Sequence, residues 1–165
     1  RDLQHEAALD DLLARVIEAR DTACPNSPPP VFLKIAPDLD PTGIDQITQT
    51  ATKRKIDGLI VSNTTLSRPA LKESQVGQES GGLSGAPLFA RSTRILAEVY
   101  QRIGSTMPLI GVGGISSGED AVAKRNAGAE LVQIYTGLIY RVPELVRETG
   151  EALARHTRQS KRPII

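Results

Sequence analysis

The apolar residues of this chain fall into two patterns, short continuous runs and longer stretches with helical spacing. The short runs have the length of buried β-strands and lie at 31–35, 57–61, 109–112 and 130–134. Elsewhere apolar residues recur every three or four positions, which predicts helices with one buried face. These helices are expected at about 3–20, from Pro41 onward after a capping Asp40, and at 87–103, 117–126 and 143–158, with a linker at 21–30. The expected buried faces include Ile44, Ile47 and Ala51 of the second helix, Ile95, Leu96 and Val99 of the third, and Leu145, Val146 and Leu153 of the last.

This alternation predicts an α/β protein with a parallel sheet. Each of the four strands is followed by a helix, and the first is preceded by a helix without a strand of its own. A (β/α)8 TIM barrel takes about 250 residues, so these 165 residues match about strands 5–8, the C-terminal half of one barrel domain spanning 1–165. A four-stranded doubly wound sheet is the alternative. Because the chain begins with Arg1 instead of Met, we expect a piece of a longer protein.

Two glycines, Gly113 and Gly114, end the third apolar run abruptly. Ser117 then stands three residues before Asp120, an arrangement similar to the capping box that opens a helix. Glycines allow a phosphate to approach the backbone, and the first amides of a helix are free donors, so the stretch suits an anion. An ordinary strand-to-helix turn explains the same residues equally well.

The fourth run ends in a similar way, at Tyr135, Thr136 and Gly137. Two consecutive strands with glycine and hydroxyl residues at their carboxyl ends are typical of the phosphate-binding corner of a (β/α)8 barrel, after strands 7 and 8. A flavin mononucleotide or a sugar phosphate is the ligand expected there.

The first two runs also carry candidate chemistry. Lys34 interrupts an apolar strand, either as a strand-end lysine that reaches solvent or as a cation facing a ligand that becomes anionic. Four small polar residues at 62–65 follow the second strand, where they either bind a polar ligand or form a local turn. The segment 66–87 has no clear periodicity and is predicted to be a lid or binding loop. Its glycines at 81–85 are candidates to close over a phosphate.

Composition narrows the function classes. With a net charge of +1 and 3% aromatic residues, neither a nucleic-acid patch nor a base-stacking platform is expected. The single cysteine, Cys24, excludes an internal disulfide and a cysteine-built metal site. No apolar run approaches the roughly 20 residues of a membrane span, and no signal peptide is evident.

Several of these stretches together resemble the dihydroorotate dehydrogenases, in their quinone-dependent class 2 branch. The matching stretches are 33–39 (LKIAPDL), 58–69 (GLIVSNTTLSRP), 79–88 (ESGGLSGAPL), 111–118 (GVGGISSG) and 127–136 (AGAELVQIYT). The resemblance implies FMN in the mouth of a barrel and the oxidation of dihydroorotate to orotate in pyrimidine biosynthesis. It also implies electron transfer to a quinone.

The resemblance also assigns residues by position. Lys34 matches the lysine beside the flavin ring, Ser62 stands where a flavin-contacting threonine is usual, and Asn63 and Thr64 match residues that bind the orotate. The cofactor-binding set is completed by residues expected around the phosphate: Ser84, Gly85, Gly113, Gly114, Tyr135 and Thr136.

The same resemblance implies functional parts upstream of Arg1. The family's catalytic base belongs there, so no catalytic residue is expected in this chain and the isolated chain is expected to be inactive. The expected partners are dihydroorotate or orotate, a quinone and the N-terminal half of the barrel, with no nucleic acid. Peripheral association with a mitochondrial inner or bacterial cytoplasmic membrane is expected through an N-terminal segment. The alternatives are a phosphate-binding barrel isomerase or lyase without flavin, and a non-catalytic half-barrel.

Overall fold

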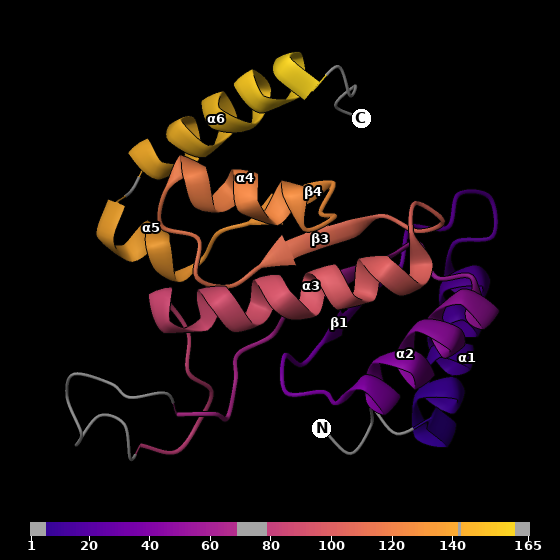
Figure 1. Ribbon diagram of the computed structural model, residues 1–165. Coiled ribbons are helices and arrows are strands. Elements are labelled where there is room, and N and C mark those ends of the chain that lie inside the picture. Colours follow the sequence, from indigo (N-terminus) through magenta and orange to yellow (C-terminus); the bar gives the residue numbers. More distant parts are fainter. Residues whose placement is uncertain (1–5, 69–78, 142, 161–165) are drawn as a thin grey trace.

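The computed structural model describes residues 6–68, 79–141 and 143–160, in which strands and helices alternate (Figure 1). The strands are β1 (Phe32–Ile35), β2 (Gly58–Val61), β3 (Leu109–Val112) and β4 (Leu131–Gln133). The helices are α1 (Glu6–Ala23), α2 (Pro41–Arg54), α3 (Phe89–Ile103), α4 (Gly118–Asn126), α5 (Thr136–Arg141) and α6 (Glu144–Ser160), and a 3₁₀ turn, η3 (Ala86–Leu88), precedes α3. All four predicted strands are present.

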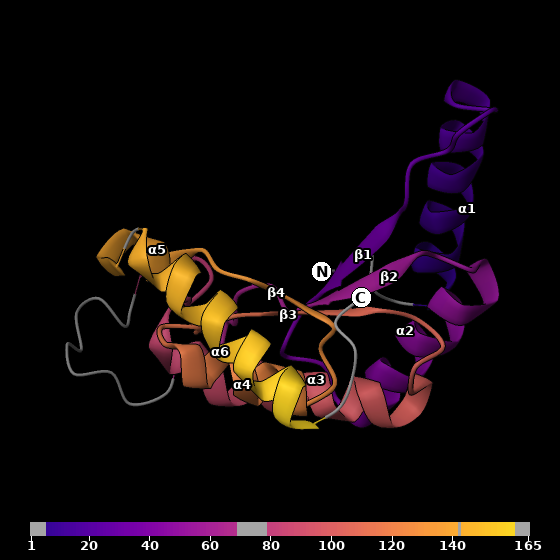
Figure 2. The same cartoon turned by 90° about the horizontal axis from the view of Figure 1, so that it is seen from above.

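The four strands form one parallel sheet in the order β1-β2-β3-β4, the order of the chain. Parallel crossovers are right-handed, so crossovers that all step in one direction carry their helices to one face. Figure 2 shows α2, α3 and α4 on that face. A doubly wound sheet reverses its strand order and has helices on both faces, so that alternative is wrong and the prediction of consecutive barrel strands is favoured.

The helix-facing side of the sheet carries the hydrophobic core. Ile35, Leu59, Val61 and Leu109 are at most 1% exposed. They pack in one cluster with buried residues of the surrounding helices: Leu9, Leu13, Ile44, Ile47, Ala51, Ile95, Leu96, Val99 and Ile103. The helical spacing read from the sequence therefore identified the buried stripes of α2 and α3 correctly.

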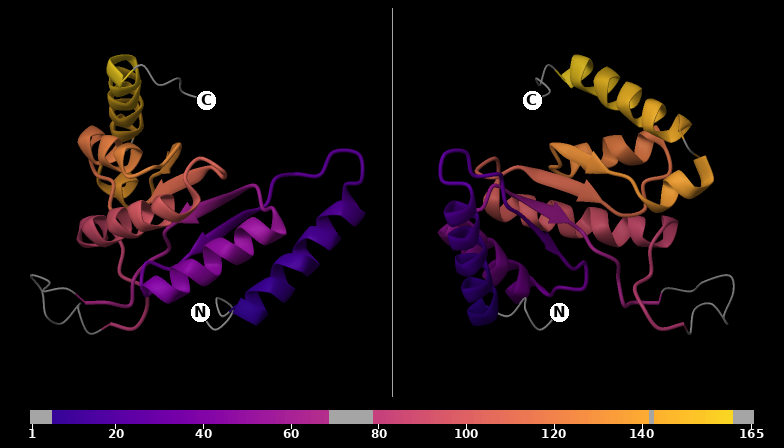
Figure 3. Two further views of the ribbon diagram at one scale, coloured as in Figure 1. Left: turned by 45° about the vertical axis from the view of Figure 1, so that its right-hand side comes forward. Right: turned by 180° about the vertical axis from the view of Figure 1, so that it is seen from behind.

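The opposite face of the sheet is mainly apolar and is open at its outer strands, β1 and β4. Lys34, Ile60, Ile110 and Leu131 lie in register across the four strands, so their side chains share this face. Leu131 is 54% exposed, and Phe32, two residues before Lys34, is 40% exposed. Seen from behind, in the right panel of Figure 3, the strands lie in front of α3. Such a face corresponds to the interior of a barrel, which side chains from other strands normally fill.

Most helix boundaries follow the predicted signals. Asp40 caps α2, with its Oδ1 accepting the Gly43 amide proton at 2.7 Å, and Pro41 occupies the first turn. Ser117 caps α4 by accepting from the Asp120 amide at 3.1 Å.

Four expectations need correction. Helix α1 continues to Ala23 and so includes the first residues of the predicted linker. Pro87 lies in the 3₁₀ turn η3, and α3 itself begins at Phe89. The short helix α5 was not predicted, because its first residues, Thr136 and Gly137, are poor helix formers. Val146, expected in the buried stripe of α6, is 55% exposed.

Among the helices at 6–68, 79–141 and 143–160, none combines the length and hydropathy that crossing a membrane requires.

The N-terminus of α4 is occupied by a carboxylate of the protein itself. Glu148 on α6 accepts the Gly118 amide proton with Oε1 at 2.7 Å, and its Oε2 accepts from Arg141 at 2.7 Å. The Gly118 hydrogen bond, aided by the positive charge of Arg141, lowers the pKa of Glu148 from its ordinary value of 4.5. This contact helps to hold α6 against α4.

We predict that Glu148→Gln lowers the stability of the fold at neutral pH and that the deficit shrinks in acid. A carboxylate with a lowered folded-state pKa stabilises the fold above about pH 4.5, and this contribution is lost as the pH falls through the folded-state value. Urea denaturation of wild type and variant between pH 7 and 3 measures the difference. Glu151→Gln is the control, because Glu151 forms only exposed ion pairs on the same helix. A deficit of constant size at every pH would contradict the prediction.

Candidate functional site

The carboxyl ends of the four strands surround a cavity of about 300 Å³. This volume lies at the lower end of the range for ligand pockets, about 300–1,000 Å³. All ten residues that the sequence analysis assigned to cofactor or substrate line it: Lys34, Ser62, Asn63, Thr64, Ser84, Gly85, Gly113, Gly114, Tyr135 and Thr136. The structure therefore brings together residues that are up to 102 positions apart in the chain.

The polar residues after β2 are held by backbone bonds to both neighbouring strands. The Ser62 amide donates to Val112 O at 3.2 Å, and the Asn63 amide donates to Ile35 O at 2.8 Å. The Ser62 hydroxyl is buried and donates to Asn63 O, while Asn63 Oδ1 accepts from the Thr64 amide at 2.9 Å. These residues form both a local turn and one wall of the cavity, so the two interpretations are compatible.

Asp38, in the turn after β1, anchors the segment that follows this wall. Its carboxylate accepts from the Thr65 hydroxyl and, at 2.9 Å, from the Leu66 amide. Arg91 on α3 lies 3.5 Å from the same carboxylate and donates to the Ser67 hydroxyl at 3.1 Å. The loops after β1 and β2 are thus tied to the first turns of α3.

The long segment after β2 returns to the site. Thr65 and Leu83 pair as an isolated antiparallel bridge, with N–H···O distances of 3.2 and 2.7 Å. Gly82 lies directly on Thr64, where a Cβ would come within 1.8 Å of the Thr64 Oγ1. Of the described residues in this segment, Ser84 and Gly85 line the cavity. The middle of the predicted loop, 69–78, lies outside the described residues.

The glycine turn after β3 has the backbone conformation that glycine favours. Gly113 has φ of +107° and Gly114 has φ of +77°. A Cβ at Gly114 would come within 2.5 Å of the Phe89 Cα, so the turn packs closely on the start of α3. The sequence analysis expected the first amides of α4 to bind the anion. The ordinary strand-to-helix turn, the other interpretation of these residues, is favoured at this helix end, because residues 116–120 do not line the cavity and the Gly118 amide donates to Glu148.

The strand end at β4 closes the other side of the cavity. Thr136 begins α5, and its hydroxyl donates to the Ser84 hydroxyl at 3.1 Å, which joins the β4 end to the returning loop. The Tyr135 residue is 81% exposed, so its side chain extends largely into solvent. Its contribution to a ligand in the cavity would come from the backbone.

Lys34 lies on the open face of β1 beside Ile60, and it both lines the cavity and reaches solvent. The sequence analysis missed Gln133, which is next to Val112 in register and places a side-chain amide at the same rim. The sequence could have revealed Gln133, because side chains alternate along a strand and Gln133 therefore shares a face with Leu131. Leu88, Val112 and Ile115 add apolar walls.

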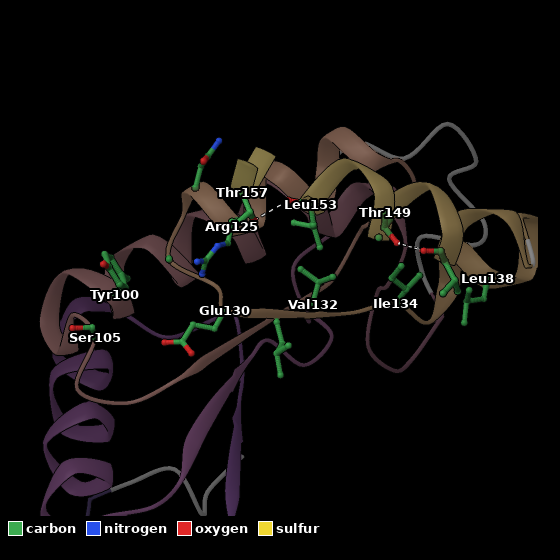
Figure 4. A pocket seen from close by; sticks show the side chains of 15 residues that line it. Tyr100, Ser105, Arg125, Glu130, Val132, Ile134, Leu138, Thr149, Leu153 and Thr157 are labelled. Carbon is green, nitrogen blue, oxygen red and sulfur yellow. Dashed lines mark hydrogen bonds between the residues drawn. The ribbon is translucent and has the colours of Figure 1, made fainter. Parts of the chain in front are cut away.

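A larger groove of about 770 Å³ lies between β4 and α6 (Figure 4). Leu153 and Thr149 of α6 approach Val132 of β4 and Ile134 just after that strand, and the groove continues past Glu130 toward α3. Of the ten predicted site residues none lines it. Within the described part of the chain, no cluster of His, Cys, Asp and Glu side chains could hold a metal ion.

Comparison with known proteins identifies the family. The family model for dihydroorotate dehydrogenase matches residues 1–156. Curated proteins named dihydroorotate dehydrogenase (quinone), from Brucella ovis and Brucella melitensis biotype 2, are each 58% identical over 157 residues, which cover 93% of this chain and 43% of theirs. The chain therefore spans less than half the length of these relatives.

Solved structures lead to the same family. The crystal structure of the Eimeria tenella DHODH in complex with ferulenol matches with a TM-score of 0.88 at 32% identity, over 97% of this chain and 46% of that one. The ligand-free DHODH structure from the same organism matches with a TM-score of 0.87 over 99% of this chain and 49% of that one. The predicted resemblance is confirmed, as is the prediction of part of a (β/α)8 barrel, and the chain belongs to the dihydroorotate dehydrogenase family.

Proposed function

We propose that this chain forms the FMN- and orotate-binding half of a quinone-dependent dihydroorotate dehydrogenase. The observation that carries the proposal is the convergence of all ten predicted residues on one cavity at the carboxyl ends of the strands. In (β/α)8 barrels this end is where active sites lie. The named relatives supply the reaction, the oxidation of dihydroorotate with a quinone as acceptor. Orotate formation belongs to pyrimidine biosynthesis.

The donor set fits a flavin mononucleotide. Gly85, Gly113 and Gly114 all have positive φ angles and leave the backbone exposed at one end of the cavity, where backbone amides suit a phosphate. The Thr136 and Ser84 hydroxyls lie at the same end, while the apolar walls suit a ring system. FMN bound there would take up the two electrons removed from dihydroorotate.

The remaining side chains suit the substrate and the charge that develops in the reaction. Asn63 and Thr64 offer the amide and hydroxyl groups that bind carbonyl and carboxylate oxygens. Lys34 supplies a cation at the cavity, where a fixed positive charge stabilises negative charge that develops in the transition state. No described residue of the cavity has a carboxylate, imidazole or thiol to act as a base.

We further propose that a second set of four strands completes the barrel. The open apolar face, the unpaired edges of β1 and β4 within the described residues, and the groove beside β4 are surfaces that such strands would cover. The exposed Val146 lines this groove. The upstream part would supply the catalytic base and the quinone site, and peripheral contact with a membrane.

The first test is the flavin itself. The complete protein that contains these residues should purify with flavin absorbance and oxidise dihydroorotate when a quinone analogue is supplied. A colourless protein that does not bind added FMN would overturn the proposal and favour a flavin-free barrel isomerase or lyase.

The 165-residue chain alone is expected to show no turnover. Removal of a proton from carbon requires a base within hydrogen-bond reach, and the described cavity residues provide none. The assay is the same quinone-analogue reaction with added FMN, run beside the complete protein as the positive control. Clear turnover by the chain alone would show that the base lies within it.

Lys34→Ala in the complete protein should slow flavin reduction by roughly 10²- to 10³-fold, because it removes a positioned charge that acts in the transition state. Stopped-flow absorbance measures the reduction rate over a range of dihydroorotate concentrations. Lys55→Ala, an exposed lysine at the end of α2, is the control. If only the dihydroorotate affinity fell, Lys34 would be a binding residue and the assigned role would be wrong.

A further inference from the structure

A fully buried lysine lies beneath the glycine turn of β3. Lys124 on α4 is 0% exposed, and its Nζ lies 5.0 Å from the centre of the Phe89 ring. Burial lowers the pKa of Lys124 to about 7, against a weaker opposing effect of Asp120 one turn earlier. A buried amine of this kind is costly to the fold, which raises the question of what it holds in place.

The partner of Lys124 is a second buried polar residue. The lysine Nζ donates to the Ser92 hydroxyl at 2.6 Å, and Ser92 on α3 is also 0% exposed. Because the hydroxyl oxygen accepts from the lysine, its own proton is available for a carbonyl. Two carbonyls lie within reach, that of Gly113 at 3.0 Å and that of Phe89 at 3.1 Å. The Phe89 carbonyl also accepts from the Thr93 hydroxyl at 2.7 Å.

The Gly113 carbonyl matters because of the peptide plane to which it belongs. In a trans peptide the carbonyl of one residue and the N–H of the next point in opposite directions. The carbonyl of Gly113 points to Ser92, on the helix side of the turn. The N–H of Gly114 therefore points away from α3, and Gly114 lines the cavity.

Neither glycine has a side chain that could hold this plane. A Cβ on Gly113 would lie 3.0 Å from the Ser92 Oγ and from the Leu88 Cδ2, so the turn rests on the start of α3. With positive φ at both residues, the orientation of the peptide depends on what its carbonyl bonds. The Ser92 hydroxyl, itself oriented by Lys124, supplies that bond.

We propose that Lys124 and Ser92 are positioning residues that orient the Gly113–Gly114 peptide so that the Gly114 N–H is directed at the phosphate of the bound ligand. The inference rests on the proposed function, because it takes the phosphate to be that of FMN. It adds two residues that lie outside the cavity lining and touch no ligand themselves.

The test compares FMN with riboflavin, which has the same ring system and lacks the phosphate. Both affinities are measured by flavin fluorescence on the flavin-free form of the complete protein. Ser92→Ala should weaken FMN binding roughly 10- to 100-fold, as for the loss of one hydrogen bond to a charged group, and leave riboflavin binding within about twofold. Lys124→Met should shift the same ratio in the same direction. The double variant should bind FMN no more weakly than Ser92→Ala does, because both residues act through the same Gly113 carbonyl.

Thr149→Ala is the matched control, since this buried hydroxyl donates to the Leu145 and Val146 carbonyls of its own helix, α6, at 2.8 and 3.0 Å. It should leave the FMN-to-riboflavin ratio unchanged. If Ser92→Ala does not fold, Ser92→Cys preserves the side-chain size with a weaker donor and should shift the ratio in the same direction.

Equal weakening of FMN and riboflavin would show that the two residues merely support the fold, and unchanged FMN binding would show that the peptide needs no such support. Either result overturns this inference while the proposed function stands. Wild-type protein that binds no FMN would overturn both.

Discussion

The parallel pairing of four strands in chain order is the constraint on which the rest of the structure depends. It places every strand's carboxyl end at one edge, so that Lys34, Asn63, Gly114 and Thr136 meet although they are far apart in the sequence. It also directs the crossover helices to one face and leaves the other open. The core and the candidate site are therefore separated, with stability supplied on the helix side and ligand groups collected at the strand ends.

The strands and the buried helix stripes could be predicted because their signals are local. Each strand is a short apolar run with a turn residue at its end, and Asp40 and Ser117 mark the caps of α2 and α4 by side-chain chemistry that depends on the next three residues. The cavity residues could be predicted for a related reason. Once the sheet is known to be parallel, the residues after each strand must lie at one edge, whereas Ser84 and Gly85 were assigned from the glycine-rich loop and the family resemblance.

What escaped prediction depends on contacts between distant elements. Glu148 could not be assigned to the N-terminus of α4 because it lies 30 residues away and reaches that end only when α6 packs on α4. Lys124 has the sequence context of an exposed helix residue, between Ala123 and Arg125, and is buried because α3 lies over it. Val146 follows the helical spacing of a buried residue, yet the groove it lines has no described segment to fill it.

The positions of Glu148 and Lys124 are connected, because both bear on which backbone amides remain available to a ligand. The start of α4 is the stronger anion site by general principles, because several amide groups and the helix dipole converge there. The protein fills it with Glu148, which stabilises the packing of α6 on α4 and removes that helix end from competition for a phosphate. The glycine turn, only a few residues earlier in the chain, has no dipole of comparable strength and must be oriented by its surroundings. A buried lysine and serine beneath the turn are costly to the fold, and the hydrogen bond that they direct to the Gly113 carbonyl supplies such an orientation.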